Sequence, residues 1–232
     1  MKRFYKTVGV GPAEEGGFRV TLDGRELRSP ARRPLALPTE ALAAAVAAEW
    51  EAQRDEIDLR SMPLTALAST VADRTGPMRA QIVGELARYA ETDLLCYRAE
   101  GPDSLVRRQE HSWQPLLDWL AMRYDARLAV QAGVMPEPQS PEALRALRLA
   151  IEALDAFTLA ALSSATAAAG SLVIALALVE QRIGPAEAAA ASQLDEAYQS
   201  EVWGEDPEAM RRRAALASDI EAAHRFLCLL RG

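Results

Sequence analysis

The clearest pattern in the chain is a long apolar segment that becomes polar towards its end. From Ala153 to Asp206, the first half is almost entirely apolar or small, and the second half ends in an acidic cluster around one tryptophan. This pattern predicts a buried helical centre followed by a helix with one face in the core and one in water. Gly170-Ser171 has the form of a helix C-cap followed by an N-cap, which predicts two short helices here.

A membrane-spanning helix is the alternative interpretation of this segment. A span requires ~20 consecutive apolar residues, whereas Asp155 opens the run and several serine, threonine and glycine residues interrupt it. Alanine, the commonest residue here, is only weakly lipophilic. We therefore expect buried core helices and no stable insertion into a membrane.

In the first 37 residues, the apolar positions recur with a different period. Phe18, Val20 and Leu22 alternate with polar residues, as in a strand with one buried face. Gly16-Gly17 and Asp23-Gly24 are hairpin turn signals. A unit this small is not stable alone, so we expect it to pack on the helices that come after it in the chain.

Helical spacing dominates after Pro38. Thr39 is a predicted N-cap for a helix that carries Leu42, Val46 and Trp50 along one face. We expect Asp103 to cap a later helix. Further expected elements are helices at 62–71, 78–91 and 103–124, a strand at 127–130 and a loop at 135–141. From 142 to 230 the chain is expected to be helical, with breaks near Leu154, Gly170, Gly184-Pro185 and 204–207. The predicted fold class is α+β, with a small N-terminal antiparallel β-unit followed by a larger, mostly α-helical domain.

Composition narrows the function classes. The 232 residues carry a formal net charge of -7, which argues against a nucleic-acid partner because phosphates require a basic patch. Cys96 and Cys228 lie in apolar contexts and are expected to be free, buried thiols of a reducing compartment. The first ten residues show neither a secretion signal nor a transit peptide, so a cytoplasmic location is expected.

Catalytic and cofactor signals are weak throughout. His224 and Cys228 share a helix face at a spacing of four residues, but a zinc site needs three or four ligands and the other histidine, His111, lies in a different helix. Ser112 follows His111 directly and cannot face it on a helix. No glycine-rich phosphate loop stands between a strand and a helix. We expect no enzyme activity, no metal and no cofactor.

The acidic cluster around Trp203 has two interpretations. Asp206-Pro207 is typical of a helix start, with aspartate as the N-cap and proline in the first turn. That interpretation does not explain a tryptophan between Glu201 and Glu205. Tryptophan beside charge is a common anchor of protein interfaces, so a partner-binding site is the second interpretation. Trp50 poses the same choice between a core side chain and a contact residue.

Several short blocks together resemble the assembly chaperones for the catalytic (F-one) sector of ATP synthase, the member that binds the alpha subunit. They occur in the family's order along nearly the whole chain, and the sixth and the last are the most specific. The blocks are residues 3–6, 22–25, 37–39, 49–53, 62–65, 91–98 (ETDLLCYR), 194–199 (LDEAYQ) and 203–206 (WGED).

The resemblance implies a chaperone without ATPase activity that holds the unassembled alpha subunit until the beta subunit arrives. It implies a two-part protein, which we place at residues 1–60 and 61–232, and we expect a monomer. The partner-contact residues carried over are Glu201, Trp203, Glu205 and Asp206, with Trp50 and Met62 as further candidates. Asp93, in the ETDLLCYR block, is interpreted as structural, either as a cap or as the partner of an arginine.

Each hypothesis predicts a different surface. A chaperone requires an exposed apolar patch rimmed by charge. A small-molecule enzyme that uses the acidic cluster requires a deep pocket with Glu201 or Glu205 beside a perturbed base. A membrane-associated scaffold would use residues 172–179.

Overall fold

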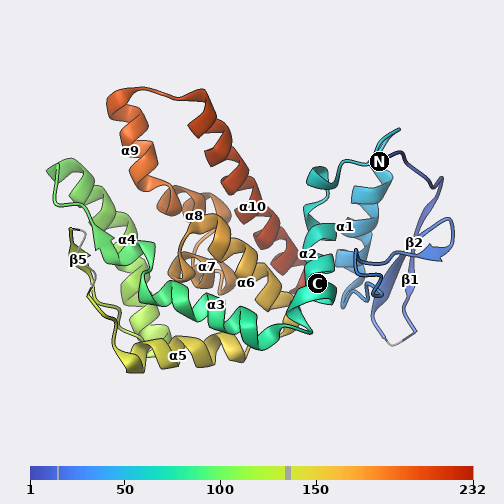
Figure 1. Ribbon diagram of the computed structural model, residues 1–232, viewed down its shortest axis with the longest axis horizontal. Coiled ribbons are helices and arrows are strands. Elements are labelled where there is room, and N and C mark those ends of the chain that lie inside the picture. The colour runs from blue at the N-terminus through green and yellow to red at the C-terminus, as the bar shows by residue number, and fades with distance from the viewer. Residues whose placement is uncertain (15, 134–136, 232) are drawn as a thin grey trace. The chain divides into compact units, whose positions relative to one another are not determined.

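The computed structural model describes residues 1–14, 16–133 and 137–231, which form two compact units. The first unit comprises residues 1–79, 156–161 and 222–232, and the second comprises residues 80–155 and 162–221. Helices α6 (Ala156–Ala169) and α10 (Pro207–Arg231) contribute residues to both units. Figure 1 shows one small sheet near the N-terminus and helices through most of the remaining chain. The predicted division at residue 60 stays a prediction.

The sheet of the first unit is antiparallel, in the order β1-β2-β3. Its strands are β1 (Val8–Pro12), β2 (Phe18–Leu22) and β3 (Arg25–Glu26). Asp23 and Gly24 both have positive φ, 49° and 78°, as the tight turn between β2 and β3 requires. The N-terminal antiparallel β-unit predicted from the two-residue period is confirmed.

Helix α1 (Glu40–Glu51) packs on this sheet. Thr39 caps it as predicted, because its side-chain oxygen accepts a hydrogen bond from the Leu42 backbone N–H at 3.2 Å. Leu42, Val46 and Trp50 lie on its buried face. The unit continues through η1 (Leu59–Ser61), α2 (Pro63–Thr70) and η2 (Val71–Thr75), a π-helical turn.

The second unit is mainly helical. Its elements are α3 (Arg79–Glu91, whose first residue belongs to the first unit), η3 (Leu94–Cys96), β4 (Tyr97–Arg98), α4 (Asp103–Tyr124), β5 (Gln131–Ala132), α5 (Pro141–Glu152), α7 (Leu172–Val179), α8 (Pro185–Ser192) and α9 (Leu194–Trp203). Strands β4 and β5 form a parallel pair.

Three local predictions in this unit need correction or restriction. The short strand predicted at 127–130 lies at 131–132, where Gln131 and Ala132 pair with the two residues of β4. Pro102, without a side-chain hydrogen bond, is the N-cap of α4, and Asp103 is the first helical residue. The loop predicted at 135–141 lies in part outside the described residues and ends where α5 begins at Pro141.

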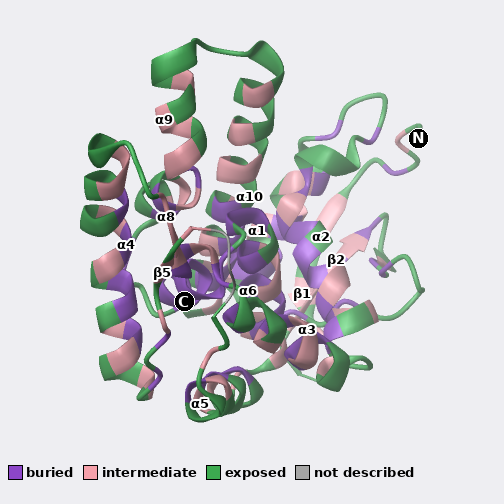
Figure 2. Ribbon diagram, turned by 60° about the vertical axis from the view of Figure 1, so that its left-hand side comes forward, coloured by how far each residue is buried: buried purple, intermediate pink, exposed green. Residues whose placement is uncertain are grey.

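Helix α7 is the most buried element of the second unit, since all eight of its residues are buried. The split predicted at Gly170-Ser171 is confirmed: Gly170 has a φ of 65°, and the Ser171 side chain accepts a hydrogen bond from the Ile174 N–H. Figure 2 shows this region as buried and the outer ends of α9 and α10 as exposed. Among the described residues, no helix combines the length and apolar character needed to cross a bilayer.

Candidate functional site

The candidate site is the turn that joins α9 to α10 in the second unit. Helix α9 ends at Trp203, Gly204 follows with a φ of 95°, and α10 begins at Pro207. Figures 1 and 2 both show α9 and the start of α10 as two arms joined by this turn. We call residues 201–210 the tip.

The tip gathers exposed apolar side chains. Trp203 is 78% exposed, Val202 55% and Met210 45%. Helix α9 contributes no residue to the buried core. Packing of the core therefore does not explain a tryptophan at the last position of this helix. An exposed apolar group of this kind is typical of an interaction surface.

Acidic side chains surround this apolar group. Glu201, Glu205, Asp206 and Glu208 are all exposed. The Asp206 carboxylate accepts hydrogen bonds from the backbone N–H groups of Glu208 and Ala209, at 3.1 and 3.3 Å. The predicted N-cap role of Asp206 is therefore confirmed, and it leaves the aspartate on the exposed tip.

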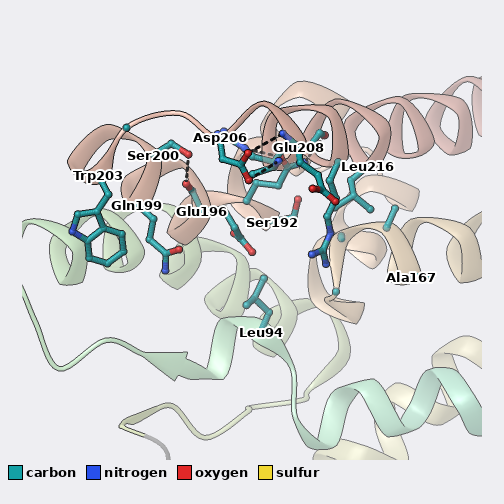
Figure 3. A pocket seen from close by; sticks show the side chains of 18 residues that line it. Leu94, Ala167, Ser192, Glu196, Gln199, Ser200, Trp203, Asp206, Glu208 and Leu216 are labelled. Atoms are coloured by element: carbon teal, nitrogen blue, oxygen red, sulfur yellow. Dashed lines mark hydrogen bonds between the residues drawn. The ribbon is translucent and has the colours of Figure 1, made fainter.

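A groove of about 660 Å³ runs beside the tip, within the second unit. Leu94, Ala167, Leu216 and Trp203 supply part of its apolar lining, and glutamates 196 and 208 are among its polar lining residues. In the close view of Figure 3, the tryptophan lies at one end of the lining, on α9, and Leu216 lies on α10. The lining also includes Arg212 and Arg213, so the groove combines apolar side chains with charges of both signs.

Glu201 faces helix α4. Arg108 donates to its carboxylate, with the closest nitrogen and oxygen 2.7 Å apart. Both side chains remain about half exposed. Neither Glu201 nor Glu205 is among the described residues that line the groove, and the group beside Glu201 is a guanidinium instead of the base that the enzyme hypothesis requires.

The structure separates the six predicted contact residues into two sets. Glu201, Trp203, Glu205 and Asp206 lie together at the tip. Trp50 and Met62 lie in the first unit and are 6% and 1% exposed. A contact role for those two would require the unit to open, because their side chains are part of its core.

Sequence reasoning did not single out Val202, Met210 or Arg108. The signal for the first two was present, because an apolar residue directly beside Trp203 and a methionine in the first turn of α10 flank an acidic turn. Arg108 gave no local signal. Its partner lies 93 positions away in the sequence, so only the packing of α4 against α9 reveals the pair.

Metal and thiol chemistry gain no support from the described residues. Over residues 1–14, 16–133 and 137–231, no group of three or more histidine, cysteine, aspartate or glutamate side chains is placed to hold a metal ion. Burial raises the pKa of the Cys96 thiol to about 12. Cys228 is exposed, which corrects the prediction that both thiols are buried.

The helical hairpin of the second unit presents exposed apolar side chains rimmed by acidic residues. Residues 2–121 match the family model described as "ATP12 chaperone protein", and the chain belongs to that family. The predicted class, a chaperone of ATP synthase assembly, is thereby confirmed. The tip lies outside the matched residues.

Solved structures extend the similarity to the tip. The crystal structure of Atp12 from Paracoccus denitrificans is 42% identical, with a TM-score of 0.93 over 99% of this chain and 98% of that one. A lysine-for-aspartate mutant of the same bacterial protein gives a TM-score of 0.92 at 42% identity, over 99% of this chain and 97% of that one. The mitochondrial protein atp12 of Schizosaccharomyces pombe is 25% identical over 216 residues, which cover 88% of this chain and 74% of that protein.

Proposed function

We propose that the chain binds the unassembled alpha subunit of the ATP synthase catalytic sector, here called the client, and covers its apolar beta-facing surface until the beta subunit arrives. The observation that carries this proposal is the tip, where Trp203, Val202 and Met210 are exposed beside an open groove. A side chain as large as tryptophan gains most by desolvation against a partner. The family membership supplies the class of partner.

The proposed client surface comprises Glu201, Trp203, Glu205 and Asp206, together with the apolar side chains of Val202 and Met210. Its acidic rim and the net charge of -7 suit a basic client surface. The apolar side chains supply affinity by burial, and the carboxylates of Glu205 and Asp206 direct the approach of the client. Trp50 and Met62 are not included, because both are buried.

A co-expression pull-down with the alpha and beta subunits of the same cell tests this proposal. We expect the chain to capture alpha and not beta. Trp203→Ala should reduce the capture of alpha at least about ten-fold, since anchoring tryptophans commonly contribute ~2 kcal/mol or more. The matched control is Leu149→Ala, because Leu149 is also an exposed apolar residue on a helix of the second unit and lies outside the tip.

The outcomes separate clearly. Loss of capture in the Trp203 variant alone supports the tip as the client surface. Equal loss in both variants would show that general surface hydrophobicity, and not the tip, holds the client. Capture of neither subunit by the unaltered, well-folded chain would overturn the proposal.

A further inference from the structure

Helix α9 is held in place mainly by polar contacts to α4. It buries no side chain in the core, yet α4 and α9 pack against each other. Three contacts join α4 to α9: Gln109 Nε2 donates to Asp195 at 2.8 Å, the Ser104 and Tyr198 hydroxyls lie 2.7 Å apart, and Arg108 pairs with Glu201 at 2.7 Å. One further contact joins α4 to the end of α8, just before α9, where Trp113 Nε1 donates to the Ala191 carbonyl at 2.9 Å.

These contacts become more exposed towards the tip. The Trp113 bond is buried, the Gln109 bond is partly buried, and the bonds of Ser104 and Arg108 are exposed. The outer turn of α9, residues 198–203, therefore depends on the two most exposed contacts. Because Trp203 is the last residue of that turn, its position follows the direction of the outer turn.

Arg108 makes two contacts with the outer turn. Its guanidinium pairs with the Glu201 carboxylate and also lies over the Tyr198 ring, 5.2 Å from the ring centroid. Tyr198 and Glu201 are three positions apart on α9, so they lie on the same face of the helix. A planar guanidinium can stack on a ring and pair with a carboxylate at once, which a lysine ammonium does less well.

We infer that Arg108 is a positioning residue for client binding: with Glu201 it forms a latch that holds the outer turn of α9 against α4 and so fixes Trp203 at the edge of the groove. Client binding then requires the latch itself, and not the sign of the charge at position 201. This inference rests on the proposed function for its client and on the contacts above for its mechanism.

The first measurement needs no client. Hydrogen exchange of the backbone amides of residues 198–203 should become about five-fold faster in Arg108→Glu and in Glu201→Arg, since each variant removes an ion pair, and the first also removes the ring contact. The double variant Arg108→Glu/Glu201→Arg restores a pair of opposite charges and should recover much of the protection. Unchanged exchange in both single variants would overturn the latch.

The second measurement is capture of the alpha subunit by the same variants. Both single variants should lose capture, and the double variant should regain it. If the double variant regains protection but not capture, the client reads the Glu201 charge directly and the inference is wrong. If the unaltered chain captures no alpha subunit, the proposed function fails, and the exchange measurement still decides whether the latch exists.

Arg123→Glu provides the matched control. Arg123 also lies on α4, pairs with Glu180 at 3.2 Å and lies over the ring of Tyr124, 5.1 Å from its centroid. It makes the same two kinds of contact as Arg108 but joins α4 to the end of α7. Its loss should leave both the exchange of residues 198–203 and the capture unchanged. An effect equal to that of Arg108→Glu would mean that any lost charge pair on α4 disturbs α9, which would overturn the specific role of Arg108.

Discussion

Asp93 shows how a single side chain organises the centre of the second unit. Its carboxylate is fully buried and accepts hydrogen bonds from the Ser171 hydroxyl at 2.7 Å and from the backbone N–H groups of Val173 and Leu95, both at 3.1 Å. Burial raises the pKa of this carboxyl, and the hydrogen bonds oppose that shift. The residue thus caps α7 and the short helix η3 together.

Replacement of Asp93 by alanine should cost about 3 kcal/mol in free energy of unfolding, because a buried hydroxyl and two buried N–H groups would lose their acceptor. Urea denaturation measures this loss. Asp58→Ala is the control, since Asp58 caps η1 in the same manner but is exposed, and its loss should cost about 1 kcal/mol or less. Similar losses in the two variants would show that the Asp93 network adds nothing beyond an ordinary cap.

Residue roles that depend on near neighbours were predictable from the sequence. The caps at Thr39, Ser171 and Asp206 follow from side chains two or three positions before the N–H groups that they bind. The exposure of Cys228 and the pairing of Arg108 were not predictable. Each depends on which face of a helix meets another element, and the local pattern does not specify that.

The start of α10 combines a structural role and a proposed binding role in Asp206. Asparagine caps a helix about as well as aspartate, whereas alanine does not. Asp206→Asn should therefore keep the stability of the chain and lose some capture of the client, while Asp206→Ala should also lose about 1 kcal/mol of stability. Thermal unfolding and pull-down measure the two effects.

Ser140→Ala is the control for lost capping, because Ser140 caps α5 through the Ala143 N–H, away from the tip. It should lose similar stability and no capture. Full capture by Asp206→Asn would contradict a role for the Asp206 charge in recognition.

At the level of elements, boundaries marked by glycine or proline were the easiest to predict. Breaks at Gly170, Gly184-Pro185 and 204–207 all occur in the structure. The break at Gln193 between α8 and α9 carries no such residue and was missed. The antiparallel hairpins were found because their strands are neighbours in sequence, whereas β4 and β5 pair across the whole of α4.

At the scale of the molecule, the two units are not continuous in sequence. Residues 156–161 and 222–232 join the first unit from far along the chain. Nothing in the sequence marks the boundaries at 161/162 and 221/222 between the units, because each boundary lies inside an uninterrupted helix. The sequence did indicate the tip, because a tryptophan at the end of an amphipathic helix has no place in the core that the pattern predicts.

The net charge of -7 raises the question of whether the whole chain or only the tip attracts the client. At ~0.1 M salt, charges act over about 10 Å, so we expect only charges near the contact to matter. The association rate should fall about ten-fold between ~50 and ~500 mM salt, as stopped-flow mixing with the client can measure.

Two pairs of substitutions, which change the net charge by the same amount, show whether the tip or the whole chain attracts the client. Glu205→Gln with Glu208→Gln removes charge from the tip, and Glu14→Gln with Glu142→Gln removes it from exposed positions elsewhere. If the tip steers the client, only the first pair should weaken the salt dependence of the association rate. Equal weakening by both pairs would instead assign the attraction to the overall charge of the chain, and a rate independent of salt would rule out electrostatic steering altogether.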